Sequence, residues 1–267
     1  MDGLESRDVA RLSRQGIARE TDYVTSESPL SISVSDSADT KFDLGITMRT
    51  EGDDRILVLG FLYSEGIIDS MSDISTITIG EGVASIMLNE SSSFNPELHL
   101  RKSTVTSSCG LCGRADLTGL MAIENALLDE HMTITLQAVS ICLNSIDREQ
   151  HIFSRTGGSH ACASFNLDGS IHRVFEDVGR HNAFDKMVGY YVERGEVPNP
   201  GLGAFVSGRA SFELVQKCIR AGFPIMIAVG APSSLAVDMA NEYGLTLGCF
   251  AKEDGLSLFS GVRRVIH

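Results

Sequence analysis

The sequence has little positive charge and no long apolar segment. Lys and Arg number 22 against 35 Asp and Glu, which gives a formal net charge of −13. A field of this sign repels phosphates at long range, so we expect no nucleic acid and no membrane surface as partners, although a local basic pocket could hold a small anion. The first twenty residues lack the apolar run of a signal peptide, and the longest apolar run, 225–231, is far shorter than a membrane span. We therefore expect a soluble, cytoplasmic protein.

The sequence contains no tryptophan, which excludes nothing, and six cysteines. Four of these lie among apolar residues and are expected to be small core residues: Cys142, Cys162, Cys218 and Cys249. Cys109 and Cys112 form a CxxC pair, which in a reducing compartment is more often chemical or metal-binding than a structural disulfide. No second CxxC and no HxxxH accompanies the pair. A zinc site would need a convergence of histidines that the sequence does not predict, so we expect no metal.

The chain is long enough for one large domain or two unequal lobes, since 43% of its 267 residues are apolar. In its first part, 53–65 predicts a helix that ends at Gly66, and the alternation after Gly80 predicts a strand. Ser-rich stretches at 25–37 and 91–93 are typical of loops or ragged strand edges.

A larger C-terminal lobe is expected over 133–267, after an N-terminal lobe over 1–132 that carries the CxxC pair. In the larger lobe, near-continuous apolar strands alternate with amphipathic helices. This is typical of a parallel βαβαβ sheet with both faces covered, so the predicted fold class is α/β. The expected elements are a hairpin at 160–166 and 171–175, a helix ended by Gly195, strands at 203–207, 224–230 and 245–250, and two intervening helices ended by Gly222 and Gly244.

A pocket is predicted beyond the carboxyl ends of these strands, where ligands of open parallel sheets bind. The ends are 207–209, 230–234 and 250–255. They offer glycines, hydroxyls, a helix N-terminus and the cations Arg209 and Lys252, which suit a phosphate-bearing ligand. Ordinary loop composition explains the same residues, and both interpretations stay open.

The CxxC pair lies in a glycine-rich loop just before a predicted helix over 115–130. The thiolate is the nucleophilic form of cysteine, and a helix N-terminus lowers the thiol pKa of Cys109 and Cys112. Arg114 would lower it further. A chemical role is therefore favoured over a metal role.

A second group of reactive side chains lies in 176–182, with two acids, Arg180, His181 and an asparagine around a glycine. Arg180 could bind a phosphate and His181 could shuttle a proton. The alternative is a helix N-cap with solvated charges. His160, beside glycines near a strand start, is expected to be structural.

Five stretches in register resemble the FdhD-type family of formate dehydrogenase accessory sulfurtransferases, and the resemblance runs from about residue 29 to residue 263. They are MRTEGDDRILVLGFLYSEGII (48–68), TSSCGLCGR (106–114), TGGSHACASF (156–165), EDVGRHNAFDKMVG (176–189) and SGRASFELVQKCIRAGFPIMIAVGAPSSLAVDMA (207–240). The resemblance implies a sulfur carrier that takes persulfide sulfur from a cysteine desulfurase. The sulfur then passes to the molybdenum bis-guanine-dinucleotide cofactor destined for formate dehydrogenase.

The resemblance also implies roles for individual residues. Cys109 matches the persulfide-bearing cysteine and Cys112 its companion. The cofactor contacts fall on Phe250, Ala251, Lys252, Glu253, Asp254 and Gly255, although this segment carries more acid than expected beside a pyrophosphate. The larger lobe is expected to be a three-layer sandwich similar to cytidine deaminases, the smaller lobe α+β, and the protein a homodimer with nucleotide sites near the interface.

Three other functions are alternatives to the sulfur carrier that the resemblance implies. A zinc nucleoside deaminase needs H-x-E and P-C-x-x-C, but Ser108 precedes Cys109 and no H-x-E occurs in the chain. A thiol–disulfide oxidoreductase needs a strand that leads into the CxxC helix, and the order of elements does not match. A chaperone that binds the cofactor or the apoenzyme without sulfur chemistry stays open.

Overall fold

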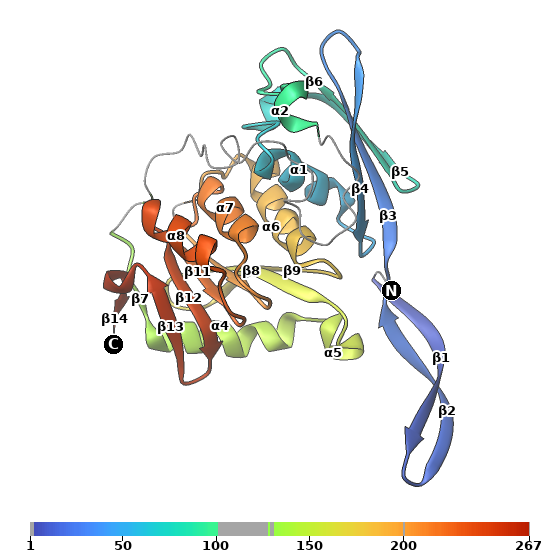
Figure 1. The fold of residues 1–267 in the computed structure, drawn as a ribbon, viewed down its shortest axis with the longest axis vertical. Coiled ribbons are helices and arrows are strands. Elements are labelled where there is room, and N and C mark those ends of the chain that lie inside the picture. Colours follow the sequence, from blue (N-terminus) through green and yellow to red (C-terminus); the bar gives the residue numbers. More distant parts are fainter. Residues whose placement is uncertain (1–2, 101–127, 129–130, 200, 267) are drawn as a thin grey trace.

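The computed structural model describes residues 3–100, 128, 131–199 and 201–266. Its main feature is a six-stranded sheet in the spatial order β13-β12-β11-β10-β8-β9 (Figure 1). Among the helices of these described ranges, none is long and apolar enough to cross a membrane. The strands of the sheet are β8 (His160–Phe165), β9 (Ile171–Asp177), β10 (Gly203–Val206), β11 (Ile225–Ala228), β12 (Thr246–Lys252) and β13 (Gly255–Ser260).

The centre of this sheet is parallel, as the sequence predicts. β10 pairs in parallel with β11, and β11 with β12, while β8 and β13 add antiparallel strands on either side. Every residue of β10 and β11 is buried, which explains their unbroken apolar sequence, because helices cover both faces of the sheet. The α/β class and the hairpin β8–β9 are confirmed.

Helices form a layer on each face of the sheet. Helix α4 lies on one face, and three helices lie on the other (Figure 1). Glycines with positive φ follow α6 and α7 at Gly195 and Gly222, as predicted. The four helices are α4 (Leu136–Glu149), α6 (Arg180–Arg194), α7 (Phe212–Arg220) and α8 (Ser234–Glu242). The three layers expected for the larger lobe are present, whereas the likeness to cytidine deaminases stays a prediction.

The N-terminal part packs directly onto these helices through α1 (Asp54–Ser64), which lies against α6. A four-stranded sheet in the order β4-β3-β6-β5 covers the far side of α1 (Figure 1). Its strands are β3 (Ser28–Ser35), β4 (Lys41–Arg49), β5 (Ile74–Gly80) and β6 (Val83–Leu88). One apolar core runs from Leu30 and Ile86 in this sheet to Met187 and Leu214 in the helices. The boundary between 132 and 133 stays a prediction.

One expectation for this region is wrong. The Ser-rich stretch at 25–37 contains β3, an inner strand paired on both sides with β4 and β6. Leu30, Ile32 and Val34 alternate with serines and point into the core. The alternation of apolar side chains, which places them on one face of the strand, outweighs the low strand preference of serine.

The N-terminal residues form a separate hairpin that projects away from the body (Figure 1). It consists of β1 (Leu4–Ser13) and β2 (Gly16–Thr25), which we call the arm. No pattern in the sequence predicts the arm. The remaining short elements are η1 (Met71–Asp73), α2 (Pro96–His99), β7 (Ile134–Thr135), α5 (Phe153–Thr156), η2 (Val262–Arg264) and β14 (Val265–Ile266).

Candidate functional site

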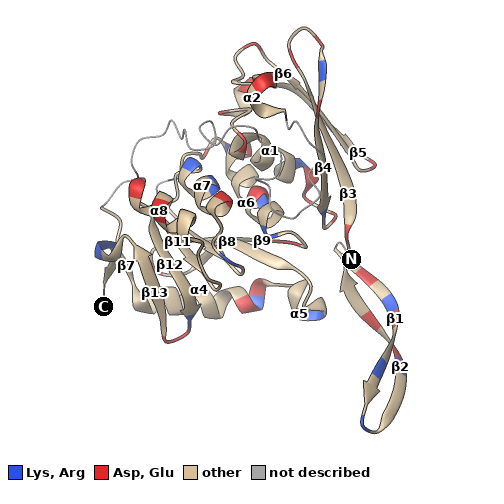
Figure 2. Cartoon of the chain, viewed as in Figure 1, with Lys and Arg blue, Asp and Glu red and all other residues tan. Residues whose placement is uncertain are grey.

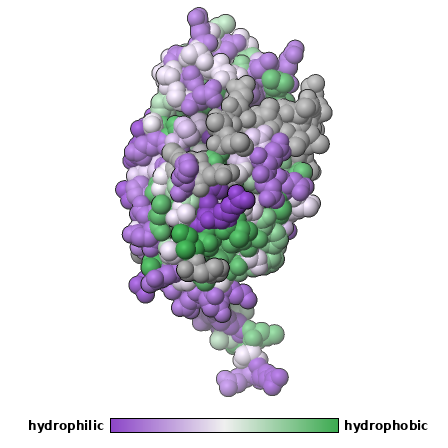
Figure 3. Space-filling model, turned by 90° about the vertical axis from the view of Figure 1, so that its left-hand side faces the viewer, coloured by the Kyte–Doolittle hydropathy of each residue, from purple (hydrophilic) through white to green (hydrophobic). Residues whose placement is uncertain are grey.

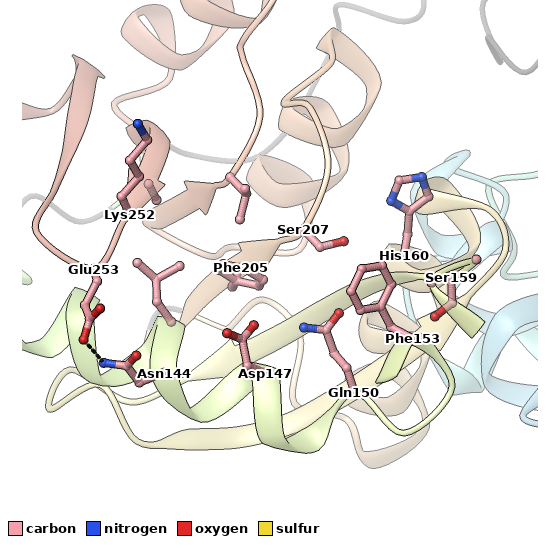
Figure 4. A pocket seen from close by; sticks show the side chains of 15 residues that line it. Asn144, Asp147, Gln150, Phe153, Ser159, His160, Phe205, Ser207, Lys252 and Glu253 are labelled. Carbon is pink, nitrogen blue, oxygen red and sulfur yellow. Dashed lines mark hydrogen bonds between the residues drawn. The ribbon is translucent and has the colours of Figure 1, made fainter. Parts of the chain in front are cut away.

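A cavity of about 540 Å³ lies between α4 and the carboxyl ends of β10, β11 and β12 (Figure 4). This is the edge of the sheet at which the sequence predicts a pocket. Ser207, Val229 and Ala251 line it at the three strand ends. The other walls come from α4, from the segment that leads into β8, and from the turn after β12.

Helix α4 and its C-cap supply a row of polar side chains to the cavity, namely Asn144, Asp147 and Gln150 (Figure 4). A spacing of three residues places them on one face of the helix, and the opposite side of α4 packs on the sheet through Val139 and Ile146. No motif in the sequence singles out α4 as a cavity wall. Its sequence does show polar residues at a spacing of three beside a row of apolar residues, which is the pattern of a helix with one face toward a polar cavity.

The predicted binding segment 250–255 is a β-hairpin rather than a loop. β12 continues to Lys252, and β13 begins at Gly255. Phe250 has a φ of 53°, next to a shift of register between Cys249 and Lys252. Such a bulge bends a strand and redirects its side chains, so the segment follows the cavity wall instead of leaving the sheet.

The residues of this hairpin divide between cavity and solvent. Ala251, Lys252 and Glu253 line the cavity (Figure 4). The Phe250 side chain is half exposed beside Phe259, with ring centroids 6.2 Å apart. Glu253 and Asp254 form the turn, and Gly255 begins β13. Contacts between these residues and a cofactor stay a prediction.

The tip of the hairpin is bonded to α4. Ser140 Oγ donates to the carbonyl oxygen of Glu253 at 2.6 Å, and Asn144 Nδ2 donates to Glu253 Oε1 at 3.4 Å (Figure 4). These bonds hold Lys252 beside the cavity. Among the described residues that line it, Lys252 is the only Lys or Arg, against the two carboxylates of Asp147 and Glu253.

The segment before β8 adds hydroxyl and imidazole groups. Ser159 Oγ donates to Glu176 Oε1 at 2.8 Å, and Ser207 Oγ accepts from the backbone N–H of Ala161 at 2.9 Å. His160 points toward the cavity from the start of β8 (Figure 4). Burial, followed by the nearby charges of Arg180 and His181, lowers the pKa of His160. Its neutral ring can donate one hydrogen bond and accept another.

Residues 176–182 lead into α6, whose N-cap is Gly179, as the helix N-cap interpretation predicts, but their charges are buried or half-buried rather than solvated. Asp177 is fully buried and accepts from the backbone N–H groups of Thr50 and Gly179. Its Oδ2 also lies 2.9 Å from Lys186 Nζ. Glu176 accepts from two backbone N–H groups at the start of α5. The segment thus fastens the N-terminal sheet and α5 to the main sheet.

The sequence offers three cations for binding phosphate, Arg180, Arg209 and Lys252, and only one of them lines the cavity. Lys252 lines the cavity, while Arg180 and Arg209 are not among the residues that line it. The Arg180 side chain lies near Gly208, and its Nε is buried without a hydrogen-bond partner in the described part of the chain. Arg209 is exposed in the loop after β10. His181 Nε2 lies 3.1 Å from Glu213 Oε2 and 3.3 Å from Ser211 Oγ.

The four isolated cysteines are free and buried, as predicted. Burial raises the pKa of Cys142 and of Cys249 to about 12, and it also raises those of Cys162 and Cys218. These thiols are therefore poor nucleophiles. Cys109, Cys112, Arg114 and, apart from Leu128, the predicted helix at 115–130 lie outside the described residues. Within the described ranges, no three His, Cys, Asp or Glu side chains gather as metal ligands.

Known proteins resemble this chain over nearly all of its length. The FdhD/NarQ family model matches residues 25–266. A protein of Streptomyces avermitilis named sulfur carrier protein FdhD is 37% identical, covering 98% of this chain and 95% of its own length. One from Sulfurisphaera tokodaii with the same name is 38% identical, with 97% of each chain covered. The crystal structure of a candidate formate dehydrogenase accessory protein from Desulfotalea psychrophila has a TM-score of 0.76 at 21% identity, covering 98% of this chain and 99% of that one.

Proposed function

This chain belongs to the FdhD/NarQ family, and on that premise we propose that it is a sulfur carrier required for formate dehydrogenase activity. The observation that carries the proposal is its near full-length identity to proteins named as sulfur carriers. The donor we propose is a cysteine desulfurase. The acceptor is the molybdenum bis-guanine-dinucleotide cofactor. This cofactor receives the sulfur in the cytoplasm, before the cofactor is inserted into formate dehydrogenase.

The sulfur is held by Cys109, with Cys112 as its companion. The Cys109 thiolate attacks the outer sulfur of the desulfurase persulfide. A new S–S bond forms on Cys109, the S–S bond of the desulfurase breaks, and the desulfurase cysteine leaves as a thiolate. Because burial raises the pKa values of the four core thiols, they do not compete as acceptors.

The cavity beside α4 is the proposed site for a guanine nucleotide portion of this molybdenum cofactor. Lys252 supplies a positive charge for phosphate. The two carboxylates beside it, Asp147 and Glu253, would repel a pyrophosphate, but a carboxylate can accept hydrogen bonds from the N1–H and the 2-amino group of guanine. The acidic character of this hairpin therefore fits the base of the nucleotide, with the phosphates directed toward Lys252.

Intact-protein mass spectrometry tests the carrier role. After incubation with a cysteine desulfurase and free cysteine, the wild-type chain should gain about 32 Da, one sulfur atom. Cys109→Ala should not gain it, whereas the matched control Cys249→Ala, which removes a buried thiol, should. If the wild-type chain takes up no sulfur and still activates formate dehydrogenase, the protein is a chaperone and the proposal is wrong.

A further inference from the structure

The arm is the part of the molecule whose surface the proposed function leaves unused. It projects from the body (Figure 1), and the family match begins only at Thr25, the last residue of β2. Ten residues per strand give the arm a length of about 30 Å. A two-stranded hairpin is at best marginally stable in water without a further strand or a packed surface. The exposed arm therefore fits a partner that covers part of it.

One face of the arm is neutralised by its own ion pairs. Residues opposite each other in an antiparallel pair share a face. On this face Arg7 forms an ion pair with Glu5. Arg11 forms ion pairs with Glu20 and Asp22 on the same face, which therefore offers little free charge to a partner. We call the opposite face the open face, and it consists of the pairs Leu4–Thr25, Ser6–Tyr23, Asp8–Thr21, Ala10–Arg19 and Leu12–Ile17.

The base of the open face packs against α5 and against the cavity wall. The Arg155 guanidinium of α5 lies 4.1 Å from the centre of the Tyr23 ring. The hydroxyl groups of Thr25 and Thr156 are hydrogen-bonded at 2.8 Å. Gly158 lines the cavity, and a Cβ on it would lie 2.8 Å from Thr25 Oγ1. The arm therefore begins directly at the wall of the cavity.

The tip of the open face is bare. Leu12 and Ile17 lie opposite each other and are 80% and 68% exposed. In the space-filling view, hydrophobic residues are visible on the arm below the body, with hydrophilic ones at its end (Figure 3). Arg19 lies on the same face as Leu12 and Ile17, and Arg14 lies in the turn. Within the described part of the chain, neither of these arginines forms an ion pair.

The tip is positively charged, although the whole chain has a net charge of −13. Residues 9–19 contain Arg11, Arg14 and Arg19 and no acid, and blue segments lie toward the free end of the arm (Figure 2). Charges are screened over about 8 Å at physiological ionic strength, so the acidic body does not cancel charges at the end of an arm about 30 Å long. The complementary surface is an apolar groove edged by carboxylates.

We propose that the arm binds the protein that receives the molybdenum cofactor, namely formate dehydrogenase before this cofactor is inserted, an inference that rests on the proposed function. The shared wall is the reason to choose the recipient. Phe153 of α5 lines the cavity and is 45% exposed beside the base of the arm. A protein held by the arm therefore lies next to the cavity that releases the cofactor, whereas the sulfur donor reacts with Cys109.

Holding the recipient in this way has a kinetic advantage. A protein bound through the tip is present at the cavity at a high effective concentration. The cofactor can then pass to it without diffusing through solution. Leu12 and Ile17 supply apolar contact area in the groove of the recipient, and Arg14 and Arg19 pair with the carboxylates at its edge.

Binding of cofactor-free formate dehydrogenase tests the arm directly. Sedimentation velocity of the full chain mixed with this enzyme measures the complex, without nucleotide or sulfur donor. Leu12→Asp with Ile17→Asp should weaken it about tenfold or more. Ile46→Asp is the matched control, since Ile46 is an apolar residue of β4 that is 70% exposed, and it should bind as the wild-type chain does. The thermal unfolding temperature should not change in any variant, because these side chains are exposed.

A charge reversal tests the carboxylates of the recipient. Arg14→Glu with Arg19→Glu should weaken the complex about tenfold or more, since like charges then meet. Arg14→Lys with Arg19→Lys keeps the charge and should retain most of the affinity. Added salt should weaken binding of the wild-type chain more than binding of the charge-reversed chain. An affinity that the charge reversal leaves unchanged would overturn the proposal.

Sulfur uptake separates the arm from the proposed function. The gain of about 32 Da from a cysteine desulfurase should be equal in the wild-type chain and the arm variants, while the arm variants should activate formate dehydrogenase poorly. If the wild-type chain takes up sulfur and the Leu12 and Ile17 substitutions leave enzyme binding unchanged, the arm proposal is wrong and the carrier role stands. If these substitutions abolish binding but the wild-type chain takes up no sulfur, the arm proposal stands and the carrier role is wrong.

Two further results would overturn the proposal by assigning the arm to another partner. Loss of sulfur uptake in the arm variants would make the desulfurase that partner. Binding of the wild-type chain to vesicles of phosphatidylglycerol, lost with Leu12→Asp and Ile17→Asp and without binding to the cofactor-free enzyme, would make it a lipid surface.

Discussion

Gly60 of α1 and Gly189 of α6 allow the two helix backbones to touch. A Cβ on Gly60 would lie 1.8 Å from the carbonyl oxygen of Asp185, and one on Gly189 would lie 1.8 Å from that of Ile56. Both distances are far shorter than any contact between a carbon and an oxygen atom that are not bonded to each other. The pair therefore sets how closely the N-terminal sheet approaches the rest of the fold.

Replacing either glycine by alanine should be strongly destabilising, since the methyl group meets backbone atoms that cannot move aside independently. We expect Gly60→Ala to lower the free energy of unfolding by about 3 kcal/mol, as for overpacking in a close-packed core. Urea unfolding followed by circular dichroism measures this. Gly80→Ala is the control, because nothing lies within 4 Å of its Cβ position. Equal stability of both variants would contradict the contact.

The buried pair of Asp177 and Lys186 should be costly to break. Each charge is nearly inaccessible to solvent, and Lys186 Nζ also donates to the carbonyl oxygens of Thr50 and Glu176. Lys186→Met leaves the Asp177 carboxylate buried without its cation, which should lower the free energy of unfolding by about 3–5 kcal/mol. The exposed pair of Arg55 and Glu193 provides the comparison, since Arg55→Met should cost well under 1 kcal/mol. Similar losses in the two variants would show that Asp177 is not isolated from water.

His160 should make stability depend on pH. Its pKa is lowered in the fold, so the unfolded chain binds a proton first as the pH falls below about 6.5. The stabilisation is complete above that pH and is lost as the pH falls toward the folded-state pKa. His160→Gln should show a shallower loss of stability between pH 6.5 and 5 than the wild-type chain, measured by urea unfolding across this range. If the stability of His160→Gln and of the wild-type chain changes with pH in parallel, the His160 ring is not shielded from solvent.

Nucleotide binding should discriminate both base and charge. If Asp147 faces guanine, the wild-type chain should bind GDP more tightly than ADP, and Asp147→Asn should remove much of that preference. Lys252→Met should weaken GDP and ADP alike and reduce the salt dependence of binding. Arg209→Met is the control for charge, because Arg209 is exposed and does not line the cavity. Isothermal titration calorimetry at two salt concentrations measures nucleotide binding by the wild-type chain and by the three variants. If GDP and ADP bind equally well to the wild-type chain, guanine does not face Asp147.

Alkylation should separate the two kinds of cysteine. Iodoacetamide reacts with thiolates, and the four core thiols have raised pKa values and no exposure. The native chain should therefore gain two adducts, on Cys109 and Cys112, and the urea-unfolded chain six. Peptide mass spectrometry assigns them. An adduct on Cys142 or Cys249 in the native chain would show that the core opens under these conditions.

The sequence predicts elements that have a regular pattern of apolar residues. It does not predict features that depend on contacts between residues distant in the chain. The buried strands β10 and β11 and the glycine-ended helices follow from local patterns. The cavity wall on α4 does not, because Asn144 and Asp147 become neighbours of Lys252 only when the helix crosses the sheet. The sequence does not predict the hairpin β12–β13, because the left-handed conformation of Phe250 has no signature in the side chain. It does not predict the arm either, because the exposed strands of the arm carry no pattern of buried apolar side chains.

The apolar core that joins the four-stranded sheet, α1, α6 and the six-stranded sheet has a consequence for cooperativity. Two lobes with separate cores could melt one after the other, but residues that share one packed interior lose their order together. Heating should therefore give a single calorimetric transition. Slowly exchanging amide hydrogens should appear in β3 as well as in β11. The strand ends that line the cavity should then unfold at the same temperature as the four-stranded sheet. A substitution that destabilises either sheet should therefore lower the unfolding temperature of both.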